Sequence, residues 1–308
     1  MTKPIPVENK KSYRQQGFIY AMLGAILFSS KSIVIKFIYE YGVDATTTLG
    51  FRLLMAMPLF AAVALFQQHK VRRGELKPLS VKNSLKLIVL GFLGYYLASF
   101  LDFASLKYIS VSLERLILLL TPTFVLMFSV LFFKKKVSAR QLLSLLISYA
   151  GVLIVFVQDF SLGGSDIVLG SILVLGSAVS YSCYVMGAGE LIREVGSTRF
   201  VAYAMLVSTF FVLVQLFLTH GVAWIVQPLP VYNWSLVHAV FNTFIPTFML
   251  MWSVERIGAP LSTQLGLIGP ISLLFLAWLF LDDPITLWDW VGTLIVLASL
   301  YILGRSKG

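Results

Sequence analysis

Apolar stretches of about twenty residues follow one another along the chain, and short polar segments separate them. A helix of about twenty residues is long enough to cross the hydrocarbon core of a bilayer. The pattern therefore predicts an all-α integral membrane protein with ten transmembrane helices. Their expected ranges are Gln16–Ile38, Thr47–Phe66, Leu85–Leu106, Ser112–Phe133, Arg140–Val157, Ile167–Ile192, Arg199–Thr219, Trp234–Val254, Ala259–Leu281 and Leu287–Gly304.

The composition supports the membrane class. Of the 308 residues 58% are hydrophobic and 12% are charged, whereas soluble domains contain about 25% charged residues. A formal net charge of +10 in a soluble protein would suggest a nucleic-acid partner. Here the cations are concentrated in alternate loops, so we expect a lipid bilayer and no nucleic acid as the partner.

The loop charges predict the topology. One set of loops contains almost all the lysines and arginines, including Lys134, Lys135, Lys136 and Arg256. The opposite set contains Lys107 as its one cation and is otherwise acidic. Cytoplasmic loops carry an excess of lysine and arginine, so both termini are expected in the cytoplasm. Nine or eleven spans would put basic loops outside, so ten is preferred. Monomer and homodimer both remain open.

A weak internal repeat accompanies this topology. A shift of 148 residues places Pro122 on Pro270 and Lys134 on Asp282. Each half contains five spans, an odd number, so the halves are expected to have opposite orientations around a central cavity. The predicted divisions are an N-terminal tail (1–15), a first repeat (16–157), an extracytoplasmic linker (158–166), a second repeat (167–304) and a C-terminal tail (305–308).

Charged side chains inside the first-half spans are the first candidates for a site, because each costs roughly 2.5–3.5 kcal/mol to insert. Lys31 is expected either to pair with Asp102 or Glu114 or to bind a carboxylate or phosphate, and both interpretations stay open. Tyr95, Ser99 and Asp102 share one helix face by spacing, and Gly91 is expected to continue it. Cavity lining is preferred over helix–helix contact for this face.

Glu114 and Arg115 differ by about 100° around a helix, so only one of them is expected to face the cavity. The carboxyls of Asp102 and Glu114 are candidates for carrying a coupling proton, although charge pairing is the more common role. Lys36 and Arg52 lie near the outer ends of their helices and are expected to snorkel to the headgroups.

In the second half the candidate substrate-binding residues are neutral: Tyr181, Tyr184, His238 and Asn242. The three histidines and the single Cys183 show no metal-ligand spacing, so neither a metal nor a cofactor is expected. The sequence also contains no H-E-x-x-H motif and no nucleophile–base arrangement, so we do not expect an enzyme. Pro122, Pro246 and Pro270 permit bends in their helices.

Residues 105–156, SLKYISVSLERLILLLTPTFVLMFSVLFFKKKVSARQLLSLLISYAGVLIVF, and 253–303, SVERIGAPLSTQLGLIGPISLLFLAWLFLDDPITLWDWVGTLIVLASLYIL, resemble the two halves of EamA-type members of the drug/metabolite transporter superfamily. The resemblance implies a secondary transporter of a small-molecule substrate in the bacterial inner membrane. It implies export or exchange by alternating access, with a proton or counter-substrate as a candidate coupling partner.

One position departs from the family pattern. Many relatives have a Trp-Gly-Ser-Asn-like run in the first helix, where this chain reads Phe28-Ser29-Ser30-Lys31. The lysine, with Arg115, Asp102 and Glu114, favours a zwitterionic or anionic metabolite such as an amino acid. The alternatives are a flippase for a lipid-linked intermediate and, less favoured, an intramembrane enzyme. A channel is disfavoured because no ring of charge is apparent.

Overall fold

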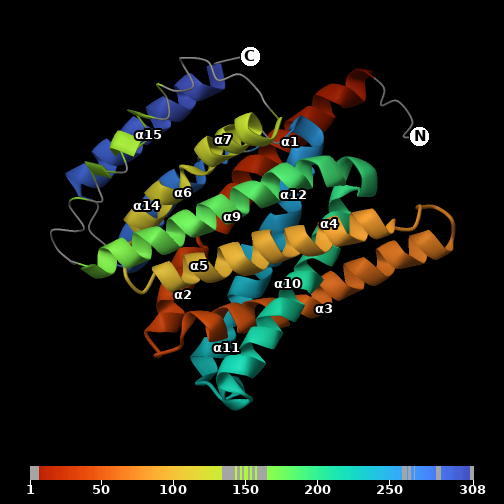
Figure 1. Ribbon diagram of the computed structural model, residues 1–308, viewed down its shortest axis with the longest axis horizontal. Helices are drawn as coiled ribbons and strands as arrows, with labels where there is room; N and C mark the ends of the chain where they lie inside the picture. Colours follow the sequence, from red (N-terminus) through yellow and green to blue (C-terminus); the bar gives the residue numbers. More distant parts are fainter. Residues whose placement is uncertain are drawn as a thin grey trace.

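The computed structural model describes residues 7–133, 165–258, 268–281 and 286–305, together with single residues between 143 and 157 and residues 262, 265 and 266. These ranges consist of helices and short connections, with no strand in them (Figure 1). Half of the predicted span Arg140–Val157, most of the linker 158–166 and the predicted start of a span at Ala259 lie outside the described residues.

Within the described residues, six helices are long and apolar enough to cross a membrane, which confirms the all-helical membrane class. They correspond to the expected first, second, third, sixth, seventh and eighth spans: Ser12–Tyr39, Ala45–Arg72, Val81–Ser105, Asp166–Val195, Ser197–His220 and Leu229–Ile257. Shorter or partly described helices occupy the expected fourth, ninth and tenth positions: α6 (Val111–Leu118) and α7 (Thr121–Phe133), α14 (Ile268–Leu281) and α15 (Leu287–Arg305).

Three spans run without interruption: α3 (Ala45–Arg72), α9 (Ser165–Val195) and α10 (Ser197–His220). The first span divides at Ser30 into α1 (Val7–Ser29) and α2 (Lys31–Tyr39). Its helix begins at Val7, so residue 16 lies inside a helix. The third and eighth spans each contain a π-helical segment in the middle. Their parts are α4 (Val81–Gly91), η1 (Phe92–Leu97) and α5 (Ala98–Ser105), then α11 (Leu229–Ala239), η3 (Val240–Phe244) and α12 (Ile245–Ile257).

The prediction of one continuous fourth helix over Ser112–Phe133 is wrong. The helix stops after Leu118 and starts again at Thr121. Pro122 has no N–H to donate to the carbonyl of Leu118, four residues earlier. The Thr121 hydroxyl donates to that carbonyl instead, at 2.6 Å. The break is therefore stable inside the protein because the released carbonyl keeps a partner.

The expectation that Gly91 extends the face of Tyr95 and Asp102 is also wrong. The π turn of η1 holds more residues than an α turn, so it rotates the helix before it relative to the helix after it. Gly91 packs closely against α10, where a Cβ atom would lie 2.8 Å from the carbonyl oxygen of Ala204. A simple α-helical wheel therefore fails across this segment.

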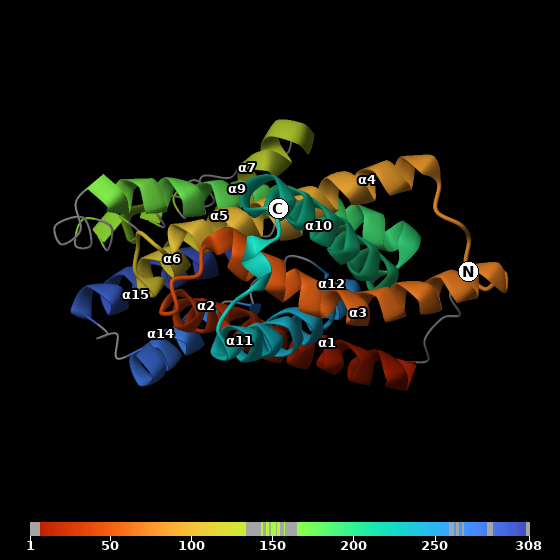
Figure 2. The ribbon, with the colours of Figure 1, turned by 90° about the horizontal axis from the view of Figure 1, so that it is seen from below.

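Helices from the two ends of the chain are interleaved (Figures 1 and 2). α1 packs along α12 and α14, and α3 packs along α10 and α11. α9 runs beside α5, η1 and α7. Much of the interior between these helices is aromatic: Phe60 of α3 lies 5.1 Å from Phe244 and 5.7 Å from Phe248, measured between ring centroids. This packing brings the interrupted spans together around one region.

Asp44 begins α3 as its N-cap. Its carboxylate accepts hydrogen bonds from the N–H groups of Thr46 at 2.8 Å and Thr47 at 3.1 Å, and from the Thr47 hydroxyl at 2.6 Å. The Nε2 atom of His220, at the end of α10, lies 3.3 Å away. Burial by itself would raise the pKa of Asp44, but the bonds from Thr47 and Thr46 and the nearby His220 hold it below its usual range.

We expect Gly94→Ala to destabilise the fold by about 1–3 kcal/mol, because a Cβ atom at this place would lie 2.3 Å from the ring of Tyr184. Gly189→Ala in α9 is the matched control, since nothing lies within 4 Å of its added Cβ. The control should stabilise by roughly 0.5–1 kcal/mol. Thermal unfolding in detergent measures both, and equal unfolding midpoints would refute the close packing of Gly94.

Asp44→Ala should cost about 0.5–2 kcal/mol at neutral pH through loss of the helix cap. A depressed folded-state pKa contributes stability above the ordinary pKa of the carboxyl and loses it as pH falls through the folded value. The advantage of the unmodified protein over the variant should therefore be constant near pH 7 and shrink below about pH 4. Unfolding midpoints across this range test it, and an advantage that grows on acidification would contradict it.

Candidate functional site

A cavity of about 190 Å³ lies where the interrupted spans meet. Its walls come from α1, α2, η1, α5, α6, α9 and α12, with further residues from the breaks beside α7 and α14. The predicted site residues that line it are Lys31, Tyr95, Ser99, Asp102, Arg115 and Tyr181. The predicted residues outside its lining are Glu114, Tyr184, His238 and Asn242, all of them buried.

Lys31 and Asp102 form a buried ion pair at the edge of the cavity. Lys31 is the first residue of α2, directly after the break at Ser30, and Asp102 lies on α5. The lysine ammonium also lies over the ring of Phe28, 5.0 Å from its centroid. Of the two interpretations left open by the sequence, pairing with Asp102 is present, and the paired lysine still borders the cavity.

Arg115, and not Glu114, borders the cavity. Its guanidinium donates to the carbonyl of Ser29 at 3.1 Å and to the hydroxyl of Ser32 at 2.5 Å. The Nε atom of Arg115 lies 3.1 Å from Oε2 of Glu114. The guanidinium therefore bridges α6 and the break between α1 and α2, so it holds the backbone of the first span at the cavity wall.

Glu114 is fully buried behind Arg115. Its Oε2 atom accepts a bond from the Ser32 hydroxyl at 3.3 Å, and its carboxyl group interacts electrostatically with that of Asp102. Two carboxylates are both acceptors, so a hydrogen bond between them would require a proton on one of them. The two candidate proton carriers are thus neighbours, and one of them borders the cavity.

Arg52 corrects another expectation, since it does not reach the headgroups. Its exposed fraction is 0%. Nε donates to the hydroxyl of Thr243 in η3 at 2.7 Å, and Nη1 donates to the hydroxyl of Ser99 at 3.2 Å. Arg52 was not among the predicted site residues. Its position in the sequence was the available signal, because it lies about two helical turns after the Asp44 cap and inside an apolar run.

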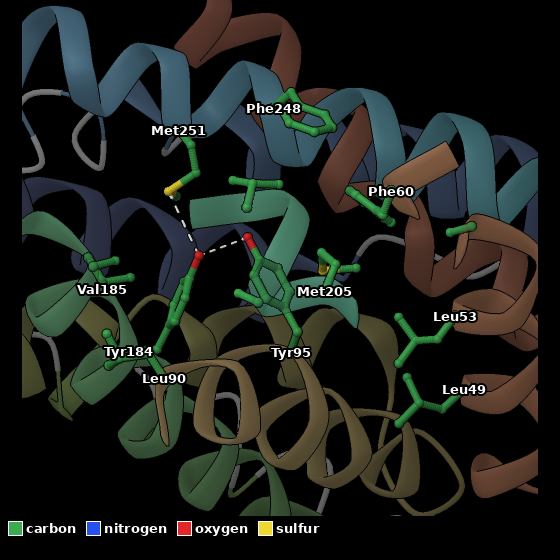
Figure 3. Close-up of a cluster of buried hydrophobic side chains, with 14 of the residues drawn as sticks. Leu49, Leu53, Phe60, Leu90, Tyr95, Tyr184, Val185, Met205, Phe248 and Met251 are labelled. Atoms are coloured by element: carbon green, nitrogen blue, oxygen red, sulfur yellow. Dashed lines mark hydrogen bonds between the residues drawn. The ribbon is translucent and has the colours of Figure 1, made fainter. Parts of the chain in front are cut away.

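Tyr95 forms the wall near Met251, and Tyr184 lies behind them (Figure 3). The hydroxyl of Tyr184 donates to the hydroxyl of Tyr95 at 2.8 Å and lies 3.8 Å from the sulfur of Met251. Tyr95 and Met251 border the cavity, whereas Tyr184 lies behind them. Tyr184 therefore supports the lining residue Tyr95 and takes no direct part in the lining.

His238 and Asn242 also act behind the wall. The ring of His238 stacks on Phe103, with centroids 5.5 Å apart and an interplanar angle of 19°. The amide of Asn242 donates to the carbonyl of Leu27 at 2.8 Å and to the hydroxyl of Ser30 at 2.6 Å. Asn242 thus satisfies backbone released at the break between α1 and α2, a positioning role.

The lining of the cavity is unevenly polar. Three charged groups lie close together in it, since Lys31 pairs with Asp102 and Arg115 donates to Ser32, next to Lys31. Most of the remaining lining surface is apolar and comes from Ala25, Phe28, Ala98, Leu118, Leu119, Val185, Leu250, Met251 and Val254. Hydroxyl groups complete the lining: Ser29, Tyr95, Ser99, Thr121, Ser177, Tyr181 and Ser262. Such a site can bind a small molecule with a charged group at one end and an apolar remainder.

A sequence model described as the EamA-like transporter family matches residues 15–157 and again residues 168–305. The chain belongs to the EamA-like transporter family. This confirms the resemblance found in the sequence and makes the chain a multi-pass membrane transporter, with a small-molecule substrate and the lipid bilayer as its partners.

Several relatives of this chain are named as transporters. It is 28% identical to the uncharacterized transporter YcbK of Bacillus subtilis (strain 168), over 90% of this chain and 88% of that protein. It is 26% identical to the uncharacterized transporter YvbV of the same organism, over 84% and 82%. It is 21% identical to the uncharacterized inner membrane transporter YicL of Salmonella typhimurium (strain LT2), over 94% and 95%.

A solved crystal structure, titled only as a protein, superposes with a TM-score of 0.62 at 16% sequence identity. The match covers 95% of this chain and 96% of that one. At this identity the likeness concerns the fold alone.

Removal of one member of the Lys31–Asp102 pair should destabilise the protein more than replacement of both. A buried ion left without its partner costs on the order of 3–5 kcal/mol, whereas an apolar pair of similar size is often neutral. We therefore expect Lys31→Met and Asp102→Leu each to lower the unfolding midpoint in detergent, and the double variant to recover much of the loss. Strictly additive losses would show that the two side chains are not energetically coupled.

Proposed function

We propose that this EamA-family chain is a secondary transporter that moves a small zwitterionic or anionic metabolite, with amino acids as candidates, by alternating access. It would act as an exporter or exchanger. The observation that carries the proposal is the cavity bordered by the buried Lys31–Asp102 pair and by Arg115. Unpaired charge is costly in a membrane interior, so charged groups that border a cavity there mark a path for a polar substrate.

The proposal includes ten spans in two inverted repeats with the divisions 16–157 and 167–304. Two observations support it. The family model matches the chain twice, once in each half. The π segments begin at Phe92 and Val240, which are separated by the same 148 residues as Pro122 and Pro270. Equivalent interruptions in two halves are common in transporters with repeated folds, whose binding sites lie between the halves.

Alternating access requires a segment that can open and close one side of the cavity, and α2 is our candidate. Three of its side chains bind α5 or the turn after it. Lys31 pairs with Asp102, the Tyr39 hydroxyl donates to the carbonyl of Phe103 at 2.6 Å, and Nζ of Lys36 donates to the carbonyl of Leu106 at 2.7 Å. Lys36 is thus half-buried and bonded to the backbone directly after α5. The break at Ser30 gives α2 a pivot.

The neighbouring carboxyls of Asp102 and Glu114 support a role for a proton in coupling, because one of them contacts Lys31 at the cavity edge. Exchange against a counter-substrate is the second candidate for coupling. Cytoplasmic termini follow from the loop charges. A bacterial inner-membrane location is supported by the name of YicL. We propose a monomer or homodimer as the unit of transport.

Transport in proteoliposomes tests the function. Liposomes preloaded with an unlabelled amino acid mixture and supplied with labelled amino acids, with and without an imposed pH gradient, should show counterflow that empty liposomes lack. Lys31→Ala should lower it by at least about tenfold, because loss of one charge-assisted contact removes about 1.5–3 kcal/mol. Lys82→Ala, an exposed lysine of α4, is the matched control and should not change the rate.

Full counterflow by Lys31→Ala would remove this lysine from the site. Translocation of a fluorescent lipid-linked probe in the same liposomes, with no counterflow of soluble metabolites, would favour the flippase alternative over the transporter proposed above.

A further inference from the structure

Three basic and two acidic side chains lie buried around the cavity, and their charges do not balance. The cations are Lys31, Arg52 and Arg115, and the carboxyls are Asp102 and Glu114. With all five ionised the cluster has one positive charge in excess, and a proton on either carboxyl enlarges the excess. The sign of the imbalance is therefore positive in either state.

No other buried charge in the described ranges compensates for it. Arg199 donates to the carbonyl of Lys77 at 2.7 Å at the start of α10, and Asp289 caps the start of α15 through Thr286. Both lie at helix ends, away from the cavity lining. Two other acidic residues lie inside predicted spans, Glu190 and Asp289, and neither borders the cavity.

The excess charge arises from Arg52. Its hydrogen-bond acceptors are the neutral hydroxyls of Thr243 and Ser99. Its Nη2 atom is fully buried and has no hydrogen-bond partner among the described residues. Ser99 itself borders the cavity, so the guanidinium lies one side chain behind the wall. Two charges separated by one side chain interact strongly where water is excluded.

The chemistry of the cavity lining also restricts how polar the uncharged part of a ligand can be. Away from Lys31, Asp102 and Arg115 most of the lining surface is apolar, with Phe28, Leu250 and Met251 among its residues. The other polar groups there are hydroxyls: Ser29, Tyr95, Ser99, Thr121, Ser177, Tyr181 and Ser262. A ligand with many hydroxyl groups would replace only part of its hydrogen bonds to water against this surface. An apolar body gains free energy on entering the same space.

We propose that the substrate is a small organic carboxylate with an apolar body, whose carboxylate group lies beside Lys31 and Arg115. This rests on the proposed function and narrows its substrate class. A carboxylate neutralises the excess cation, and both neighbouring cations can donate to it. A zwitterion leaves the excess in place, and its ammonium group would compete with Lys31 for Asp102. A cationic ligand adds to the excess.

Two matched ligand series on the purified full-length protein in lipid nanodiscs test the charge. One is 3-phenylpropionate, 3-phenylpropanamide, phenylalanine and 3-phenylpropylamine; the other is 4-methylpentanoate, its amide and leucine. Calorimetry at neutral pH should give each carboxylate a Kd at least about tenfold lower than its amide and its amino acid. Equal affinity for carboxylate and amide, tighter binding of the amino acid, or no binding of either carboxylate would overturn the proposal.

Arg52 variants test the cause of the preference. Arg52→Gln removes the excess charge, and Arg52→Lys keeps it as the matched control. The carboxylate-to-amide affinity ratio should fall about tenfold in the glutamine variant and persist in the lysine variant. The ratio is measured within one protein preparation, so partial loss of folded protein does not alter it. An unchanged ratio in Arg52→Gln would overturn the assignment of the preference to Arg52.

The result of the ligand-binding test can be distinguished from the result of the transport test. Selective carboxylate binding without counterflow of any labelled ligand would refute secondary transport and leave the ligand class intact. Counterflow of leucine or phenylalanine at rates equal to those of the matched carboxylates would support transport and overturn the ligand class.

Discussion

The buried pair of Lys31 and Asp102 is the interaction on which the arrangement of the cavity depends. Each ion alone would be costly in a water-excluded interior, so the two must lie together. Because Lys31 begins α2 and Asp102 lies on α5, the pair fixes the outer part of the first span against the third. The position of α2 then determines where the break at Ser30 lies and where the charged end of the cavity is.

The helix breaks follow the same logic at the level of the backbone. A membrane interior provides no water for released carbonyl and N–H groups, so a break survives only where protein groups replace the missing bonds. At Ser30 the amide of Asn242 does so, and at Leu118 the hydroxyl of Thr121 does so. Both breaks border the cavity through Ser29 and Leu119. The polar side chains and the helix breaks therefore occur together beside the cavity, because backbone groups released at a break need protein groups as hydrogen-bond partners.

Sequence reasoning recovered what depends on local composition. The membrane class and the six long spans follow from apolar length, and the cost of unpaired charge reduced the partners of Lys31 to Asp102, Glu114 or a ligand. It could not recover features set by distant neighbours. The burial of Arg52 depends on Thr243, 191 residues away. The faces on which Gly91 and Tyr95 lie depend on a π turn that no residue pattern predicts. Tyr184 lies behind the cavity wall because Gly94, which has no side chain, lets the Tyr184 ring approach the backbone of η1. In the fourth span Pro122 was evident in the sequence. Where α6 ends and α7 begins depends on which group donates a hydrogen bond to the carbonyl of Leu118.

Under the proposed function, the ion pair also links substrate binding to movement of α2. A carboxylate that approaches Lys31 competes with Asp102 for the same ammonium group. If Lys31 turns to the ligand, Asp102 needs another partner. Two groups are near it: the carboxyl group of Glu114, once one of the two carboxyls carries a proton, and the guanidinium of Arg52, whose charge interacts with that of Asp102. Either partner would stabilise the freed aspartate and release α2 from one of its three attachments to the third span. The excess cation would then serve two steps, since it attracts the ligand and also lowers the free-energy cost of separating the pair.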